Sequence, residues 1–234
     1  MATMAQVNAM RLAQRTLSNR AKSAVRALWN DVRGSAPETV RNAFLSAMPQ
    51  IVDTYGTASA EVAAEYFEEL TGYTAEPSDS LNRDQVEGVV RYQAGKLWTA
   101  EQAGFVTGLM TDTDKLVKAF GRDTIYSNGD RRGVRYARIP SGSKTCAFCM
   151  VMASRDILYL SRYAAGEKGS GNEYHGDCDC QVTPVSDASE LPEGVDELYA
   201  VYESARDESG SGDLKDIVAT ARRQNPDMFT DGVY

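Results

Sequence analysis

The chain has 234 residues, of which 42% are hydrophobic and 25% are charged, and its formal net charge is −8. This length can bury a substantial core, and the composition is ordinary for a globular protein, so a disordered or fibrous chain is excluded. No run approaches the roughly 18 consecutive apolar residues of a membrane helix. Because the N-terminus also lacks a secretory signal, we expect a protein made and used in a cytosol.

The first predicted element is a basic helix that ends at Gly34. Apolar residues recur in it at three- and four-residue spacing, which places them on one face. They are Leu17, Ala21, Ala24, Val25, Leu28, Trp29 and Val32. Residues 1–33 also hold six cations against the single acid Asp31: Arg11, Arg15, Arg20, Lys22, Arg26 and Arg33. This charge either contacts phosphate or an acidic partner, or forms a solvated helix face.

Three more helical segments follow. The second helix begins near Pro37 and continues to Leu70, and Pro49 predicts a kink or a break near Ala47–Met48. A turn-rich loop occupies residues 71–80, and helical spacing returns over residues 83–98 and 114–126. The turn-forming run Ser-Asn-Gly-Asp at residues 127–130 predicts that the last of these helices ends there.

The pattern then changes to short strand candidates at residues 134–139, 157–160 and 181–185, with a loop at 165–172. Residues 187–213 hold nine acids and only Arg206 to oppose them, and weak helices are expected near 195–205 and 214–224. The sequence therefore predicts an α+β protein: an N-terminal helical region, a small α+β domain and an acidic, partly helical tail. We place these units at residues 1–130, 131–185 and 186–234.

All four cysteines and the only histidine lie within 35 residues, and they suggest a metal site. Cys146 and Cys149 have the C-x2-C spacing that lets two thiolates on one turn reach a single ion, and His175, Cys178 and Cys180 follow. Zinc takes four such ligands and can stabilise a domain too small to build a large core. Since a tetrahedral site takes four ligands, we expect Cys146, Cys149 and His175 to bind, with either Cys178 or Cys180 as the fourth. The spare cysteine would pack as a small hydrophobe.

Other interpretations of this cluster stay open. Four cysteines allow three disulfide pairings, although the chain has no export signal. A redox C-x2-C pair normally opens a helix in a doubly wound fold, and no such alternation of strands and helices is visible. A cysteine–histidine nucleophile pair is a third alternative.

The same residues resemble the signature of actinobacterial phage head proteins related to protein F of phage Mu. The resemblance is carried by Tyr136-Ala-Arg-Ile-Pro140, by Cys146-Ala-Phe-Cys149, by Met152-Ala-Ser-Arg155, by Tyr174-His-Gly-Asp-Cys-Asp-Cys180 and by Pro184-Val185. The resemblance is specific only over about residues 131–185. The N-terminal helices are similar to those of the family in being long and rich in alanine, but they share no motif with them.

This resemblance implies a low-copy minor capsid protein that acts in head (procapsid) morphogenesis near the portal. It implies the portal or the major capsid protein as partner. Because the whole chain is acidic, we expect at most weak contact with packaged DNA. The lack of a long apolar run predicts no contact with a membrane. The protein would lie inside the capsid of the virion, and in the host cytoplasm during assembly.

Relatives are often labelled capsid maturation proteases, which gives an alternative function. A cysteine-type protease would use Cys149 or Cys178 activated by His175. No Ser/His/Asp triad can be built, because the single histidine lies inside the cysteine cluster. We therefore favour a structural protein with a zinc site over an enzyme.

Overall fold

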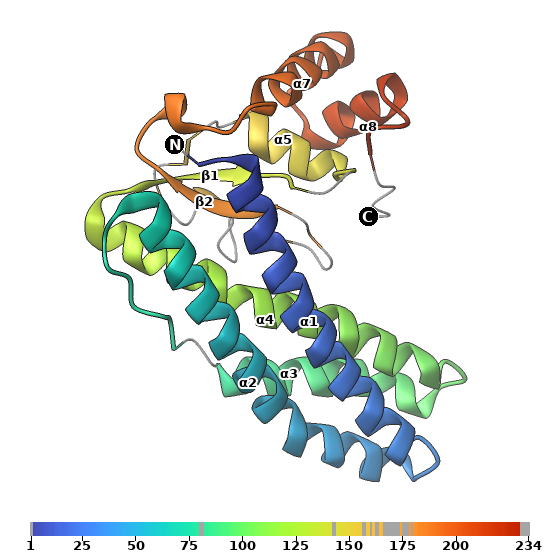
Figure 1. The fold of residues 1–234 in the computed structure, drawn as a ribbon. Helices are drawn as coiled ribbons and strands as arrows, with labels where there is room; N and C mark the ends of the chain where they lie inside the picture. Colours follow the sequence, from blue (N-terminus) through green and yellow to red (C-terminus); the bar gives the residue numbers. More distant parts are fainter. Residues whose placement is uncertain are drawn as a thin grey trace.

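The computed structural model describes residues 2–79, 82–141, 144–155, 158–159, 161, 164–165, 174, 178 and 180–229. These residues form three layers (Figure 1). A bundle of long helices lies on one side, a two-stranded antiparallel sheet lies in the middle, and short helices cover the other side. The predicted α+β class is confirmed.

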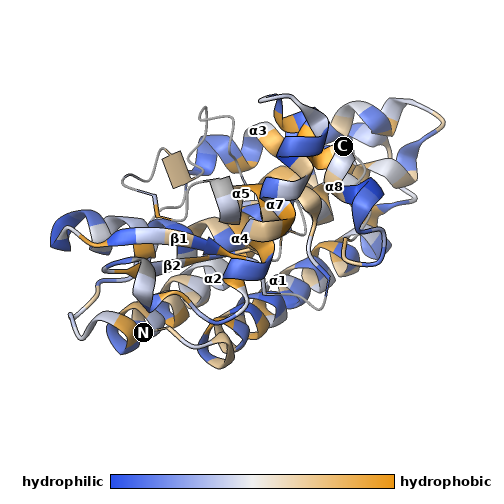
Figure 2. Ribbon diagram, turned by 90° about the horizontal axis from the view of Figure 1, so that it is seen from above, coloured by the Kyte–Doolittle hydropathy of each residue, from blue (hydrophilic) through white to orange (hydrophobic). Residues whose placement is uncertain are grey.

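The bundle contains α1 (Met4–Val32), α2 (Pro37–Thr71), α3 (Arg83–Ala94), the 3-10 turn η1 (Gly95–Trp98) and α4 (Gln102–Arg132). The apolar stripes of these helices meet in one core, where Phe44 and Phe105 contact each other edge to face with ring centroids 5.0 Å apart. Viewed from above, apolar residues gather around α4 and α5 in the middle of the molecule (Figure 2).

Two expected interruptions do not break their helices. α2 runs through Pro49, and its axis bends part-way along (Figure 1). Met48 and Val52 are fully buried on either side, so core packing offsets the hydrogen bond that proline cannot make. The helix end expected at residues 127–130 is wrong. α4 continues to Arg132 and is capped by Gly133, which has φ +67°. Inside α4, the Asn128 amide exchanges hydrogen bonds with the backbone of Glu76, and this tertiary contact overrides the local turn preference.

The sheet joins β1 (Arg135–Ile139) to β2 (Gln181–Val185), as two of the three strand predictions required. Arg135 pairs with Val185 and Ile139 pairs with Gln181, so the end of β1 lies beside the start of β2. The third strand candidate is described only in part. Within it, Tyr159 forms an isolated antiparallel bridge with Tyr136.

The outer layer contains α5 (Ala147–Arg155), the turn η2 (Ala188–Glu190), α7 (Val195–Ser209) and α8 (Leu214–Gln224). The acidic C-terminal segment therefore forms the two expected helices, and their apolar sides bury Tyr202 and Ile217 against α5. The N-terminus reaches the same layer, because Ala2 donates a backbone hydrogen bond to Glu190. The division into three units at residues 130 and 185 stays a prediction.

Gly56 allows α2 and α4 to approach closely. A Cβ atom at this position would lie 2.6 Å from ring atoms of Phe120, which is buried in the core. We expect Gly56→Ala to destabilise the protein by about 1–3 kcal/mol because the core becomes overpacked. Gly88→Ala is the matched control, since nothing lies within 4 Å of its Cβ position. Alanine's higher helix propensity should make that variant more stable, by up to about 1 kcal/mol. Denaturant unfolding measures both, and equal stabilisation by both would contradict the close approach.

Candidate metal centre

The two cysteine pairs come from neighbouring ends of the sheet. Cys178 and Cys180 lie just before β2, whereas Cys146 directly precedes α5 and Cys149 lies in its first turn. Because the start of β2 pairs with the end of β1, the short connection from β1 to α5 brings both pairs to one place. The antiparallel register thus joins residues about 30 positions apart in sequence.

The four cysteines form one buried cluster, and Phe148 and Tyr174 pack against it. The sulfur atoms of Cys149, Cys178 and Cys180 all lie within 4.8 Å of one another, and those of Cys149 and Cys178 are 3.3 Å apart. Three converging sulfurs supply most of the donors of a tetrahedral thiolate site. The donor set therefore fits a soft metal ion such as zinc.

Cys146 occupies the position that caps the N-terminus of α5. Its carbonyl accepts the Met150 N–H at 3.0 Å, and its Sγ accepts the Cys149 N–H at 3.2 Å. This is the hydrogen bond that serine or threonine makes at a helix N-cap. The positive end of a helix also stabilises a thiolate, which favours an ionised sulfur at this place.

In the absence of a cation, the thiols of Cys149 and Cys180 hold their protons, because their pKa values are raised. Hydrogen bonds with Cys146, Cys178 and Cys180, followed by burial, raise the pKa of Cys149 well above its ordinary value. Burial is the main cause that raises the pKa of Cys180. Since zinc binds thiolates, binding must displace these protons and will weaken as the pH falls.

Two arginines lie over the Tyr174 ring, and this ring packs against the cysteine cluster. The guanidinium carbon of Arg122 lies 3.7 Å from the ring centroid, and that of Arg138 lies 4.0 Å from it. Arg138 also lies 5.7 Å from the Phe148 ring. Both aromatic neighbours of Arg138 therefore belong to the shell around the cysteines.

A buried ion pair connects the cluster to the bundle. Lys118 Nζ lies 2.9 Å from Asp114 Oδ2 and donates a 3.1 Å hydrogen bond to the Cys178 carbonyl. Ser18 Oγ donates to Asp114 Oδ1 at 2.6 Å, so α1 takes part as well. Burial alone would raise the pKa of Asp114, but the charge of Lys118, its hydrogen bonds and Lys22 hold it below its ordinary value.

The five predicted ligands can now be placed. Cys149, Cys178 and Cys180 come together as candidate ligands, and Cys146 lies in the same cluster. His175 lies outside the described residues. Both Cys178 and Cys180 reach the cluster, although only one of them was expected to, because residues two apart on an extended chain lie on the same side.

The sequence reasoning missed the buried cations Lys118, Arg122 and Arg138. A signal was present in α4, because Asp114, Lys118 and Arg122 follow one another at four-residue spacing and share one helix face. Arg138 gave a weaker signal, as a lone cation between Ala137 and Ile139 in β1. All three cations are buried.

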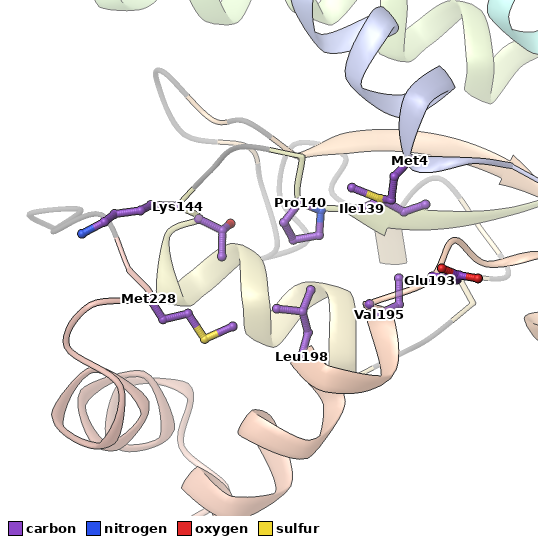
Figure 3. A pocket seen from close by; sticks show the side chains of 10 residues that line it. Met4, Ile139, Pro140, Lys144, Glu193, Val195, Leu198 and Met228 are labelled. Atoms are coloured by element: carbon purple, nitrogen blue, oxygen red, sulfur yellow. The ribbon is translucent and has the colours of Figure 1, made fainter.

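A separate cavity of about 190 Å³ lies among the start of α1, the end of β1 and α7. Met4, Ile139 and Leu198 give it a mostly apolar lining, while Lys144 and Glu193 lie on opposite sides (Figure 3). Its polar groups do not converge on one point as the cysteines do. We therefore take the cysteine cluster as the candidate functional site.

Fold and site together define a mostly helical α+β protein with a buried thiol cluster that fits a metal ion. Residues 1–205 match the family model described as VG15 protein, which is most of the chain. The chain therefore belongs to the VG15 family of phage proteins. No curated protein and no solved structure matches it. Within the described part of the chain, no helix has the length and apolar character needed to cross a membrane.

Proposed function

We propose that this protein is a phage minor capsid protein that acts in head (procapsid) morphogenesis near the portal. The observation that carries the proposal is membership of the VG15 family, which places the chain among phage proteins. The resemblance of residues 131–185 to Mu F-like head proteins supports the finer role. The proposed location is the capsid interior.

We further propose that the cysteine cluster holds one structural zinc ion per chain. The support is the convergence of Cys149, Cys178 and Cys180, with Cys146 in the same cluster. Such an ion would join the start of α5 to the start of β2 and so stabilise the small sheet. Zinc would supply binding energy for folding and no reaction step.

The burial of Cys149 favours this structural role over a cysteine protease. Its side chain is 0% exposed, and that of Cys178 is 1% exposed. A nucleophile must reach the scissile carbonyl, and a reactive cysteine is usually partly exposed. The geometry therefore supports a site that holds the fold together.

The proposed contact surface for the portal or capsid is the basic stripe of α1, which consists of Arg11, Arg15, Lys22, Arg26 and Arg33. These positions fall on one side of an α-helix at 100° per residue, and Arg15 and Arg26 are exposed. Lys22 is less suitable for a test, because it lies 3.8 Å from the buried Asp114 carboxylate. An acidic protein partner fits this stripe better than DNA, which the net charge of −8 would repel.

Reversing the charge of the stripe tests the proposal. We expect Arg15→Glu with Arg26→Glu to lower incorporation of the protein into procapsids at least several-fold, while its circular dichroism spectrum stays unchanged. The matched control, Arg83→Glu with Lys215→Glu, makes the same change of net charge at exposed sites on α3 and α8. Quantitative mass spectrometry of purified procapsids measures the copy number.

Normal incorporation of the stripe variant would contradict the docking surface. Absence of the wild-type protein from both procapsids and virions would contradict the head-assembly role itself. If DNA were the partner, binding to duplex DNA would weaken with salt by a slope of about 0.9 per phosphate contact.

A further inference from the structure

A groove of about 620 Å³ lies between α1 and α4, in the helical bundle. Its α1 wall is formed by residues that recur at three- and four-residue spacing: Asn19, Lys22, Ser23, Arg26, Ala27 and Asn30. Thr107, Met110 and Thr111 form the α4 wall. The α1 wall extends for about 16 Å along the helix axis. A groove of this length between two helices can hold one face of a third helix.

Short side chains that bond to their own helix leave room in the groove. The hydroxyl of Ser23 donates to the Asn19 carbonyl at 2.9 Å, and that of Thr107 donates to the Ala103 carbonyl at 3.2 Å. Thr111 donates to the Thr107 carbonyl in the same way. Because these hydroxyls are satisfied within their own helices, a docked helix can cover them without supplying new acceptors.

The charge of the groove selects the kind of helix that fits it. Lys22 and Arg26 line it one turn apart, and none of its described lining residues is acidic. Lys22 lies 3.8 Å from the buried Asp114 carboxylate, so Arg26 contributes most of the exposed positive charge. The Arg26 guanidinium lies 3.7 Å from the Met110 sulfur on the opposite wall. An occupant of this groove should therefore carry negative charge on the face that it presents.

Helix α7 of the same protein has such a face. Four of its exposed residues fall within about 60° of one another at 100° per residue: Asp196, Ala200, Glu203 and Asp207. They also extend for about 16 Å along the helix. Glu203 and Asp207 have the same four-residue spacing as Lys22 and Arg26 in the groove. Tyr199, which is 36% exposed, borders this face and adds apolar area to it.

The two surfaces lie far apart within one chain. α7 belongs to the outer layer, whereas the groove borders the half of α1 that is furthest from this layer (Figure 1). We propose that α7 of one copy docks in the groove between α1 and α4 of a second copy. Because the two surfaces differ, the contact is head-to-tail, and its repetition gives a ring or an open chain. This self-association goes beyond the proposed head-assembly role, and it leaves Arg11 and Arg15 available to a capsid partner.

Sedimentation velocity of the purified full chain, over a range of concentrations, measures the self-association. We expect the wild type to form dimers and larger species as its concentration rises, and added salt to weaken them because the contact is largely ionic. Arg26→Glu should weaken association at least about ten-fold, and Glu203→Lys with Asp207→Lys should do the same, because each change places like charges opposite each other.

Matched controls make the same charge changes elsewhere. Arg20→Glu reverses an exposed arginine on another face of α1. Glu61→Lys with Glu65→Lys reverses two exposed acids at four-residue spacing on α2. Both controls should associate as the wild type does, and circular dichroism checks that every variant is folded. Equal weakening by the controls and by the groove and α7 variants would overturn the proposal.

Mixing the two disrupted variants tests the head-to-tail geometry. The Arg26→Glu chain keeps its α7 face, and the Glu203→Lys/Asp207→Lys chain keeps its groove. Their equimolar mixture should therefore form a 1:1 dimer and nothing larger, because each chain retains only one of the two surfaces. A wild type that stays monomeric, or a mixture that does not associate, overturns the proposal. A monomeric wild type whose incorporation into procapsids requires Arg26 would assign the groove to a portal or capsid helix instead, and would leave the head-assembly role standing.

Discussion

Replacing Cys149 with serine is expected to release the metal and to loosen the sheet and α5, while the helical bundle stays folded. Cys149 lies at the centre of the cluster, with its sulfur 3.3 Å from that of Cys178 and hydrogen-bonded to Cys146 and Cys180. A serine hydroxyl is a poor zinc ligand, and structural zinc contributes about 10–16 kcal/mol of binding energy in small zinc domains. The loss should therefore be the largest of any single substitution in this protein.

The measurement combines metal content with hydrogen exchange. Wild-type protein should contain about one zinc per chain, and Cys149→Ser should contain much less. Faster exchange should appear in β1, α5 and β2 and not in α1 or α2. Ala153→Ser is the matched control, since it adds a hydroxyl at another buried position of α5 without removing a ligand. Unchanged zinc content and stability in Cys149→Ser would refute the site, and a zinc-free wild type without free thiols would indicate disulfides instead.

Breaking the buried ion pair should have the second-largest effect. Lys118→Met removes the cation 2.9 Å from the Asp114 carboxylate and the donor to the Cys178 carbonyl. Leaving a buried carboxylate without its main counter-charge typically costs about 3–5 kcal/mol, so we expect a loss in this range. Denaturant unfolding of zinc-saturated protein measures the loss.

An exposed ion pair in α3 provides the control. Arg91 and Glu87 also lie 2.9 Å apart at i,i+4 spacing, but the Arg91 side chain is 59% exposed. Arg91→Met should therefore cost only about 0–1 kcal/mol. The double variant Asp114→Leu/Lys118→Met should be more stable than Lys118→Met alone, because it removes both charges. Equal losses for Lys118→Met and Arg91→Met would show that burial does not matter here.

The same pair sets a pH dependence. Despite burial, the pKa of Asp114 in the folded protein is lowered below its ordinary value of 3.8, mainly by the charge of Lys118. The folded state therefore binds fewer protons than the unfolded state at this group. Its stabilisation is present above about pH 4 and is lost as the pH falls through the folded pKa. In Lys118→Met the pKa of Asp114 should rise, so that this group contributes a smaller loss of stability on acidification, which denaturant unfolding between about pH 3 and pH 7 measures.

Local patterns in the sequence determined much of the fold. The apolar spacing predicted α1 and α2, and Gly133 and Pro140 bounded the strand at residues 134–139. The two C-terminal helices were also expected near their observed positions. These features depend on side-chain periodicity and turn residues within a few positions of one another, which a sequence shows directly. The clustering of the cysteines was visible for the same reason.

Contacts between distant residues decided the rest. α4 continues past residues 127–130 because Asn128 bonds to a loop some 50 positions earlier, and α2 continues past Pro49 because the core encloses it. Cys178 and Cys180 reach Cys149 because the pairing of β1 with β2 brings the start of β2 beside the connection from β1 to α5. Packing on α5 gave the acidic C-terminal segment a buried side.

The environment of the site likewise depended on tertiary structure. Lys118, Arg122 and Arg138 occupy positions that a sequence alone would assign to solvent-exposed charges. Only the packing of α4 and β1 around Tyr174 buries them beside the thiols. The electrostatic character of a site depends on which charges share a low-dielectric interior, and that is set by distances in space rather than by separation along the chain.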